Sequence, residues 1–338
     1  MTQPGATAHP LTVSGAVELA VLERSGMIES THLGAAILLD GTGSTLRSLG
    51  DTSALVYPRS TLKLLQAIAV QRLGATLDGE QLVLSTASHA GTPEHVRVVR
   101  EILATAGLDD SELGCPADWP GDPAARAAVV AAGGTSSPVF MNCSGKHAAF
   151  LLACVRHGWS LEDYLEPQHP LQLAIADVVE EYTGETIVHS GVDGCGAPVH
   201  AVTLSGLARA VGRVAAAGGV ASGGADDEED AAGRLARAIL DNPWAIDGEG
   251  RANTVTISTL GIIAKLGAEG VMVMGCADGT AVAVKILDGS LRAATLVALD
   301  LLVAAGAVER ADSDAVLEVT LEKITGGNET VGRIRTTF

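Results

Sequence analysis

Aromatic side chains and basic residues are both scarce in this sequence of 338 residues. Phe, Tyr and Trp number three each, and 22 Lys and Arg residues face 40 Asp and Glu residues, which gives a formal net charge of −18. A surface that binds nucleic acid needs basic side chains to neutralise phosphates and, for single strands, aromatic rings on which bases stack. The composition therefore predicts a protein that does not bind nucleic acid.

Long apolar runs are also missing, and we do not expect the opening residues to form a secretory leader. No run reaches the length of about 20 apolar residues that a membrane-spanning helix needs. The first fifteen residues hold neither Lys nor Arg and no continuous apolar segment, so we expect a cytoplasmic protein without a membrane partner. The cysteines number five, an odd count that favours reduced thiols over a disulfide framework. A cysteine with a special role would then be a metal ligand or a nucleophile.

The hydrophobic pattern predicts an α+β fold. Apolar runs joined by glycine-containing turns predict β-hairpins at 33–49 and 271–286. Because hairpins lie near both ends and helices between them, we expect an antiparallel sheet built from both termini, with an inserted helical lobe. Helical spacing predicts helices at 60–73, 93–106, 170–182, 201–217 and 290–305, and short apolar runs at 82–84, 316–321 and 331–336 are interpreted as strands.

The length lies between that of one large domain and that of two, because a single core stops growing at roughly 250–300 residues. We expect residues 1–338 to form one domain with two lobes. Residues 218–233 combine glycines with five consecutive acidic residues, which repel one another and cannot bury surface. This segment is predicted to be an acidic, glycine-rich surface loop.

The sequence Ser60-Thr61-Leu62-Lys63 is an S-x-x-K motif at the start of a predicted amphipathic helix. Residues three positions apart share a helix face, so the Lys63 amine can reach the Ser60 hydroxyl. A serine is a weak nucleophile unless a neighbouring base removes its proton, and a crowded or desolvated lysine can do so. The alternative is an ordinary helix cap followed by a surface lysine.

Two further segments carry polar groups that could line the same cleft. Ser88 and His89 follow the apolar run 82–84 and could present a hydroxyl and an imidazole, although Thr92 could equally cap the helix expected from residue 93. Lys265 lies in the sequence Lys-Leu-Gly, which partly matches the K-T-G motif of serine acyl-enzymes but lacks its hydroxyl. A solvated lysine before a turn glycine is the other interpretation.

Two glycine-containing loops each hold a cysteine among polar groups. Cys143 begins the sequence Cys-Ser-Gly-Lys-His, and Cys195 ends the sequence Asp-Gly-Cys. With Lys146, His147 or Asp193 these thiols could bind zinc, which favours thiolate and imidazole ligands. The spacing matches no standard zinc finger, and buried free cysteines that behave as small apolar side chains are the alternative.

These motifs occur in one order along the chain: S-x-x-K, Ser-His, Cys-Ser-Gly-Lys-His, Asp-Gly-Cys and Lys-Leu-Gly. In that order, over residues 24 to 335, the sequence resembles the L-asparaginase II family of the rhizobial type. The resemblance implies a fold similar to that of serine β-lactamases and glutaminases. It also implies hydrolysis of L-asparagine to L-aspartate and ammonia, and a homodimer.

By position, the resemblance implies two catalytic tandems, Ser60 with Lys63 and Ser88 with Lys265. We hypothesise that Ser60 attacks the side-chain carboxamide of asparagine to give a β-aspartyl ester, which water then hydrolyses. Lys63 is the expected base, made neutral by the nearby Lys265 cation and by burial. Ser88 would relay protons to the departing ammonia.

The resemblance also implies a zinc ion held by Cys143, Lys146 and Cys195. Because a serine nucleophile is already available, we expect this zinc to orient the substrate or tighten its binding rather than to generate hydroxide.

Three further residues are assigned to substrate binding. A zwitterionic amino acid needs one partner of each sign, so Arg59 is the candidate for its α-carboxylate and Asp193 for its α-ammonium. His147 is placed in the same group.

Two alternatives stay open at the level of sequence. A glutaminase, or a broader serine amidase or peptidase, would use the same motifs, since one methylene changes discrimination by only about 1–3 kcal/mol. A non-catalytic zinc-binding protein would use the cysteine loops as a structural clamp and Ser60 as a helix cap.

Overall fold

The computed structural model describes residues 9–219 and 231–338. Its central element is an eight-stranded sheet with the strand order β11-β12-β1-β2-β10-β9-β8, and β3 pairs with β2 beside this path. Every pairing in the sheet is antiparallel. The strands are β1 (Val17–Arg24), β2 (Met27–Leu39), β3 (Thr45–Leu49), β8 (Ile263–Gly267), β9 (Val271–Gly275), β10 (Ala281–Ile286), β11 (Ile324–Gly326) and β12 (Glu329–Thr336).

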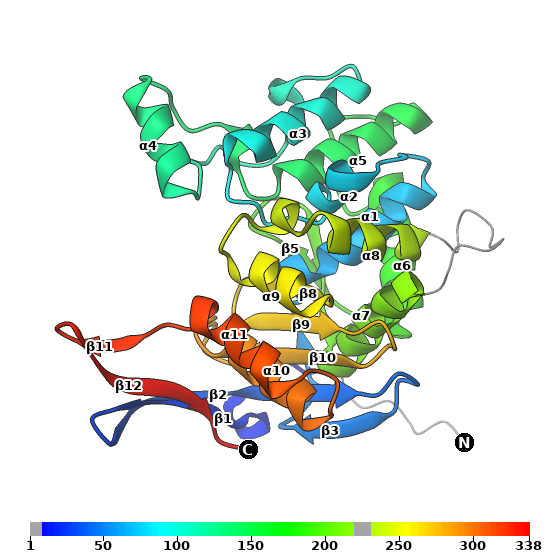
Figure 1. Ribbon diagram of the computed structural model, residues 1–338. Coiled ribbons are helices and arrows are strands. Elements are labelled where there is room, and N and C mark those ends of the chain that lie inside the picture. Colours follow the sequence, from blue (N-terminus) through cyan, green and yellow to red (C-terminus); the bar gives the residue numbers. More distant parts are fainter. Residues whose placement is uncertain (1–8, 220–230) are drawn as a thin grey trace, which may run out of the picture.

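Strands from the two ends of the chain lie side by side in this sheet. β1 pairs with β12, and β2 pairs with β10, so the hairpins expected at 33–49 and 271–286 meet in one structure. The helices between them form a separate layer, drawn above the sheet in Figure 1. The predicted α+β class, a sheet built from both termini with an inserted helical lobe, is confirmed.

Helices cover both faces of the middle of the sheet. Every residue of β9 is buried, and because successive side chains in a strand point to opposite faces, both faces must be covered. α7 and α10 each pack on β2, β9 and β10. The helices are α1 (Lys63–Arg72), α2 (Gly79–Leu84), α3 (Pro93–Thr105), α4 (Pro123–Ala131), α5 (Ser144–His157), α6 (Pro170–Thr183), α7 (Leu204–Gly219), α8 (Ala231–Asp241), α9 (Ala252–Leu260), α10 (Ala294–Ala304) and α11 (Arg310–Thr320).

Four short strands form two small sheets away from the main one. β4 (Leu55–Val56) pairs with β7 (Val202–Thr203), and β5 (Ser190–Val192) pairs with β6 (Pro198–His200). The second pair holds the loop 193–197, in which Cys195 is buried. Within the described ranges, no helix combines the length and the apolar character needed to cross a bilayer.

Two predicted strands are helical. The run 82–84 forms the end of α2, and the run 316–321 belongs almost entirely to α11. Both runs are too short for periodicity to separate a strand from a buried helix. In α11, Ser313 and Val316 are buried and Leu317 is half-buried, whereas residues 314, 315 and 318 are exposed, which is helical spacing rather than the alternation of a strand.

The acidic segment predicted as a loop has helical ends. Gly218 and Gly219 close α7, and residues 231–233 open α8. Residues 220–230, which include the acidic run, lie outside the described residues. α7 also begins three residues later than expected from residue 201, because 202–203 form β7.

Candidate active site

Ser60 lies on a tight turn that leads into the helical lobe. Arg59–Leu62 form one turn of 3-10 helix, and α1 follows directly from Lys63. Arg59 has a φ of 51°, a left-handed conformation that a non-glycine residue adopts only when its surroundings enforce it. The chain therefore reverses just before Ser60 and directs this residue to the wall of a cavity.

Ser88 is held by backbone contacts with a distant segment. Its amide donates to the Ile246 carbonyl oxygen at 2.9 Å, and the Ala90 amide donates to that of Asp247 at 2.9 Å. These bonds fix the segment 88–90 against the turn that follows residue 246. They place Ser88 in the same cavity as Ser60.

The four predicted catalytic side chains come together, but their hydrogen bonds centre on Ser88. The Ser88 hydroxyl oxygen accepts from Lys63 Nζ at 3.2 Å and from Lys265 Nζ, on β8, at 2.9 Å. Lys63 Nζ also donates to the Ala87 carbonyl oxygen at 2.5 Å. Within the described part of the chain, the Ser60 hydroxyl makes no hydrogen bond. Ser88 thus links the two lysines, whereas the contact expected between the Lys63 amine and the Ser60 hydroxyl is not formed among the described residues. The Ser60 hydroxyl remains available to a ligand.

Burial changes the acidity of the second lysine. Lys265 is completely buried, and this desolvation, with the charge of Lys63 as the next cause, lowers the pKa of Lys265 to about 7. The carboxylate of Asp247 acts in the opposite direction. A large fraction of Lys265 is therefore unprotonated at neutral pH, and its amine can accept a proton. The sequence-based prediction had the roles the other way round, with Lys265 as the cation, because the sequence does not show how completely Lys265 is buried.

The cavity shared by the two serines has a volume of about 280 Å³. This lies just below the ~300–1,000 Å³ of pockets that bind drug-sized molecules, so the space suits a small metabolite. It is lined by Ser60, Ser88, His89, Asp118, Trp119, Gly121, Phe140, Asn142, Asp247, Arg251, Asn253, Leu266, Gly267, Ala268 and Leu291.

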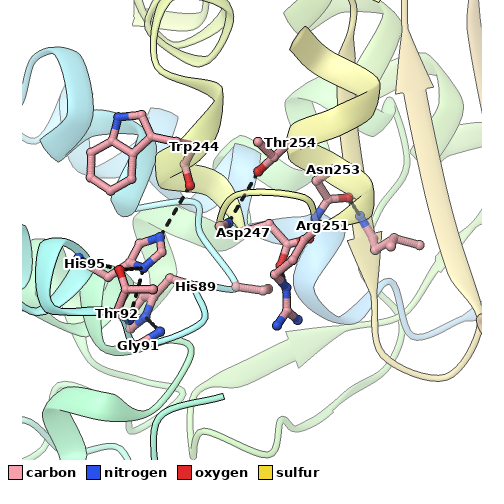
Figure 2. Close-up of polar contacts among 12 residues, drawn as sticks. His89, Gly91, Thr92, His95, Trp244, Asp247, Arg251, Asn253 and Thr254 are labelled. Atoms are coloured by element: carbon pink, nitrogen blue, oxygen red, sulfur yellow. Dashed lines mark hydrogen bonds and ion pairs between the residues drawn. The ribbon is translucent and has the colours of Figure 1, made fainter. Parts of the chain in front are cut away.

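One wall of this cavity consists of residues that the sequence analysis did not select. Asp247 and Arg251 form an ion pair, with Arg251 Nε 2.6 Å from Asp247 Oδ1, and Figure 2 shows them beside Asn253 and Thr254 at the start of α9. Asn253 Oδ1 accepts from the Leu266 amide at 2.8 Å, which ties this wall to β8. The sequence signal that could have pointed to this pair is an acidic and a basic residue at the two ends of the glycine-containing segment 247–251. Ordinary polar turns show the same pattern.

A buried pair of imidazoles supports the segment that carries Ser88. His89 Nδ1 accepts from the Gly91 amide at 3.1 Å, so its Nε2 is the donor to the Ser144 hydroxyl at 2.8 Å. The ring of His95 stacks on that of His89 with centroids 5.2 Å apart. Burial lowers the pKa of both histidines, so both are neutral at pH 7. Thr92 caps α3 as one of the two sequence interpretations expected, and Figure 2 shows it beside His95.

The residues expected to bind zinc also come together. Lys146 Nζ lies 2.9 Å from Cys195 Sγ. The neighbouring thiol of Cys195 is the largest influence that lowers the pKa of Cys143, and Cys143 in turn raises the pKa of Cys195. Next to them, the Nδ1 of the buried His147 is 2.6 Å from the Tyr164 hydroxyl.

The chemistry of these donors fits a zinc ion in part. Two thiols and an amine are adjacent, and His147 Nε2 is buried without a hydrogen-bond partner among the described residues. Thiolate and imidazole are ligands that zinc favours. Across 9–219 and 231–338, however, no three His, Cys, Asp or Glu side chains are grouped to hold a metal. A zinc site would therefore require the neutral amine of Lys146, and the thiols nearby raise the pKa of that amine despite its burial.

Arg59 and Asp193, the residues expected to bind a zwitterion, bind each other. Arg59 Nε donates to Asp193 Oδ1 at 2.7 Å, and its NH1 lies 3.8 Å from Glu269 Oε1. Although burial opposes it, the bond from Arg59 keeps the pKa of Asp193 below its usual value. Neither residue, nor His147, is among those that line the cavity of Ser60 and Ser88.

Comparison with known proteins identifies the family. A family model for L-asparaginase II matches residues 20–336. The chain belongs to the L-asparaginase II family. Membership identifies it as an enzyme of the amidohydrolase type. The antiparallel sheet and its helical lobe confirm the α+β class, and the likeness to serine β-lactamases stays an expectation of the resemblance. No curated protein matches the sequence.

Solved structures show more distant similarity. Mglu in its glutamate form is 15% identical, with a TM-score of 0.36, over 81% of this chain and 61% of the Mglu chain. This chain thus spans about three fifths of the length of Mglu. A beta-lactamase from Mycobacterium bovis is 18% identical, with a TM-score of 0.34, over 85% of this chain and 95% of its own.

Proposed function

We propose that this protein hydrolyses the side-chain amide of L-asparagine, giving L-aspartate and ammonia through a serine acyl-enzyme. The observation that carries the proposal is the small cavity in which Ser60 and Ser88 lie together, with the Ser88 hydroxyl bonded to two buried lysine amines. Lysines are almost never fully buried without a specific reason. An amine with a pKa near 7 beside a serine hydroxyl is the equipment that nucleophilic catalysis requires.

In this mechanism Ser60 is the nucleophile. Its oxygen forms a bond to the amide carbon, and the carbon–nitrogen bond then breaks to leave a β-aspartyl ester and ammonia. Lys63 takes the proton from Ser60 while passing one of its own through Ser88 to the neutral Lys265. The bonds of 3.2 and 2.9 Å at the Ser88 oxygen support this relay. The proton returns to the departing nitrogen, and water then cleaves the ester.

A zinc ion held by Cys143, Lys146 and Cys195 is part of the proposal. When bound, it would supply a Lewis-acid centre that orients the substrate or tightens its binding. Removal of zinc by a chelator distinguishes this role from that of a structural clamp. A clamp loses thermal stability sharply, whereas a zinc that serves substrate binding loses affinity for asparagine first.

The experiment that tests the function measures ammonia release from L-asparagine and L-glutamine, side by side. Wild type is compared with Ser60→Ala and with Ser111→Ala, a control on another 3-10 turn, which is exposed and outside the cavity. We expect release from asparagine, loss of that activity in Ser60→Ala, and normal activity in the control. In acid-quenched wild type, mass spectrometry should find one aspartyl group on the peptide that contains Ser60.

Other outcomes would change the assignment. Release from glutamine alone would favour a glutaminase, and release from neither amide would direct attention to other serine amidase or peptidase substrates. Full turnover by Ser60→Ala would remove the nucleophile assignment. The homodimer and the cytoplasmic location remain predictions of the sequence.

A further inference from the structure

We propose that Asp247 and Arg251 form the subsite that binds the α-ammonium and α-carboxylate groups of an α-amino-acid amide. The inference rests on the proposed function, because it names the groups that hold the unreacting end of that substrate. It replaces Arg59 and Asp193 in this role.

The charges on the cavity wall support this assignment. Among the described residues that line the cavity, Arg251 is the only Arg or Lys. An α-carboxylate that enters the space of Ser60 and Ser88 therefore finds its cationic partner in Arg251. Asp247 lies directly beside it and supplies the negative charge that an α-ammonium group needs.

The geometry of the pair leaves ligand-binding atoms available. Arg251 uses Nε to bind Asp247 Oδ1, and within the described residues its two terminal nitrogens make no hydrogen bond. A guanidinium can present two parallel N–H groups to one carboxylate. The Asp247 side chain is only 7% exposed and that of Arg251 is 47% exposed, so the pair extends from the buried wall into the open space.

The turn that carries the pair is fixed in place. The amide of Arg251 donates to the Gly248 carbonyl oxygen at 3.2 Å, and the amide of Gly248 donates to the Thr254 hydroxyl at 3.4 Å. Gly248 has a φ of 131°, which L side chains rarely adopt. Because the Asp247 carbonyl oxygen also accepts from the Ala90 amide, the subsite is anchored to the segment that carries Ser88. The distance between the proposed substrate-binding pair and Ser88 is thus fixed by the backbone.

The competing pair, Arg59 and Asp193, fits this role less well. Arg59 is engaged with both Asp193 and Glu269, and neither member of the pair lines the cavity. The two pairs contain the same residue types, so substitutions at each provide a direct comparison.

The test uses three ligands that differ only in their charged groups. L-asparagine has both groups, succinamic acid lacks the α-ammonium, and β-alaninamide lacks the α-carboxylate. Binding is measured by calorimetry in the Ser60→Ala background, so that no ligand is consumed. The variants are Arg251→Gln, Asp247→Asn and Arg59→Gln. Arg310→Gln is the matched control, because Arg310 pairs with Asp300 at the same 2.6 Å, with side chains 53% and 14% exposed.

The expected result is a loss that follows ligand charge. Arg251→Gln should weaken the binding of L-asparagine and of succinamic acid by about 10- to 100-fold, the range for the loss of a hydrogen bond to a charged group. It should change the affinity for β-alaninamide by less than about threefold. Asp247→Asn should weaken the binding of L-asparagine and of β-alaninamide and leave the affinity for succinamic acid unchanged. The Arg310→Gln control should bind all three ligands with wild-type affinity.

Three results would overturn the assignment: equal losses for all ligands, no loss in either variant, or a charge-dependent loss in Arg59→Gln alone. Arg251→Lys, which keeps the charge, should bind succinamic acid better than Arg251→Gln does. It provides the comparison if the glutamine variant melts early.

Binding also separates this inference from the proposed function. If wild type releases no ammonia but binding follows the charge pattern, the subsite stands and asparagine hydrolysis is wrong. If ammonia is released and binding ignores both residues, hydrolysis stands and the subsite is wrong.

Discussion

The low pKa of Lys265 leads to a quantitative prediction for the pH dependence of activity. In the proposed relay Lys265 must be unprotonated before Ser60 can lose its proton. With a pKa of about 7, the unprotonated fraction is about one eleventh at pH 6 and about ten elevenths at pH 8. We therefore expect kcat/KM for L-asparagine to rise about tenfold from pH 6 to pH 8, with its midpoint near 7.

The cause of the shift provides a second check. The Asp247 carboxylate raises the pKa of Lys265, in opposition to burial and to the Lys63 charge. Asp247→Asn should therefore move the midpoint to lower pH, whatever it does to the maximal rate. The Arg310→Gln control should leave the midpoint unchanged.

The assay is ammonia release at constant ionic strength, with substrate well below KM, between pH 5.5 and 9. This range extends to both sides of the expected midpoint. Low substrate is used because the pH profile of kcat/KM reports the pKa values of groups in the free enzyme. A profile that is flat between pH 6 and pH 8 would refute the role of Lys265 as proton acceptor. Retention of the same acid limb in Lys265→Met would refute it independently.

Three further predictions concern binding and stability. Cys195→Ser should raise KM for asparagine and leave kcat within a small factor, and a collapse of kcat at unchanged KM would contradict the assigned zinc role. Gly145→Ala should destabilise the fold by about 1–3 kcal/mol in a denaturant titration, because a Cβ there would lie 2.4 Å from the Leu84 carbonyl oxygen; unchanged stability would show that α5 and α2 separate easily. The Thr92 hydroxyl caps α3 by accepting from the His95 amide, so Thr92→Ala should lower the free energy of unfolding by about 0.5–2 kcal/mol. A much larger loss would indicate that the His89–His95 stack depends on this cap.

The parts of the fold that could be predicted are those with a local physical cause. The turn between Leu39 and Thr45 contains glycines that favour a hairpin, and the proline at residue 93 is suited to the first turn of α3. The run 82–84 has no such signal. All three of its side chains are buried, because α2 packs on several elements at once, and a short apolar run then looks the same in a helix and a strand.

The candidate site likewise contains some residues that local spacing could predict and others that it could not. The S-x-x-K motif at Ser60 has a spacing that indicates proximity, whereas Ser88 and Lys265 lie 177 positions apart and were connected only through the resemblance. Asp247 and Arg251 were missed because their significance depends on the cavity they face, and a sequence does not show cavities. Contacts formed by the sheet and the 88–90 segment bring these residues together.

The site contains several features that oppose folding, and this argues for a functional origin. Lys63 and Lys265 are 1% and 0% exposed and both donate to one hydroxyl, so two amines that repel each other when charged are held out of water. Arg59 keeps a left-handed backbone beside Ser60. A core selected for stability alone would place apolar residues at the lysine positions, because removing cations from water costs free energy. Asp247 reduces that cost for Lys265, so the residue proposed to bind substrate also helps to set the acidity of the proton acceptor. Binding of an ammonium group to Asp247 would then weaken its effect on Lys265 and lower the pKa of that amine further, which favours the unprotonated form when substrate is present.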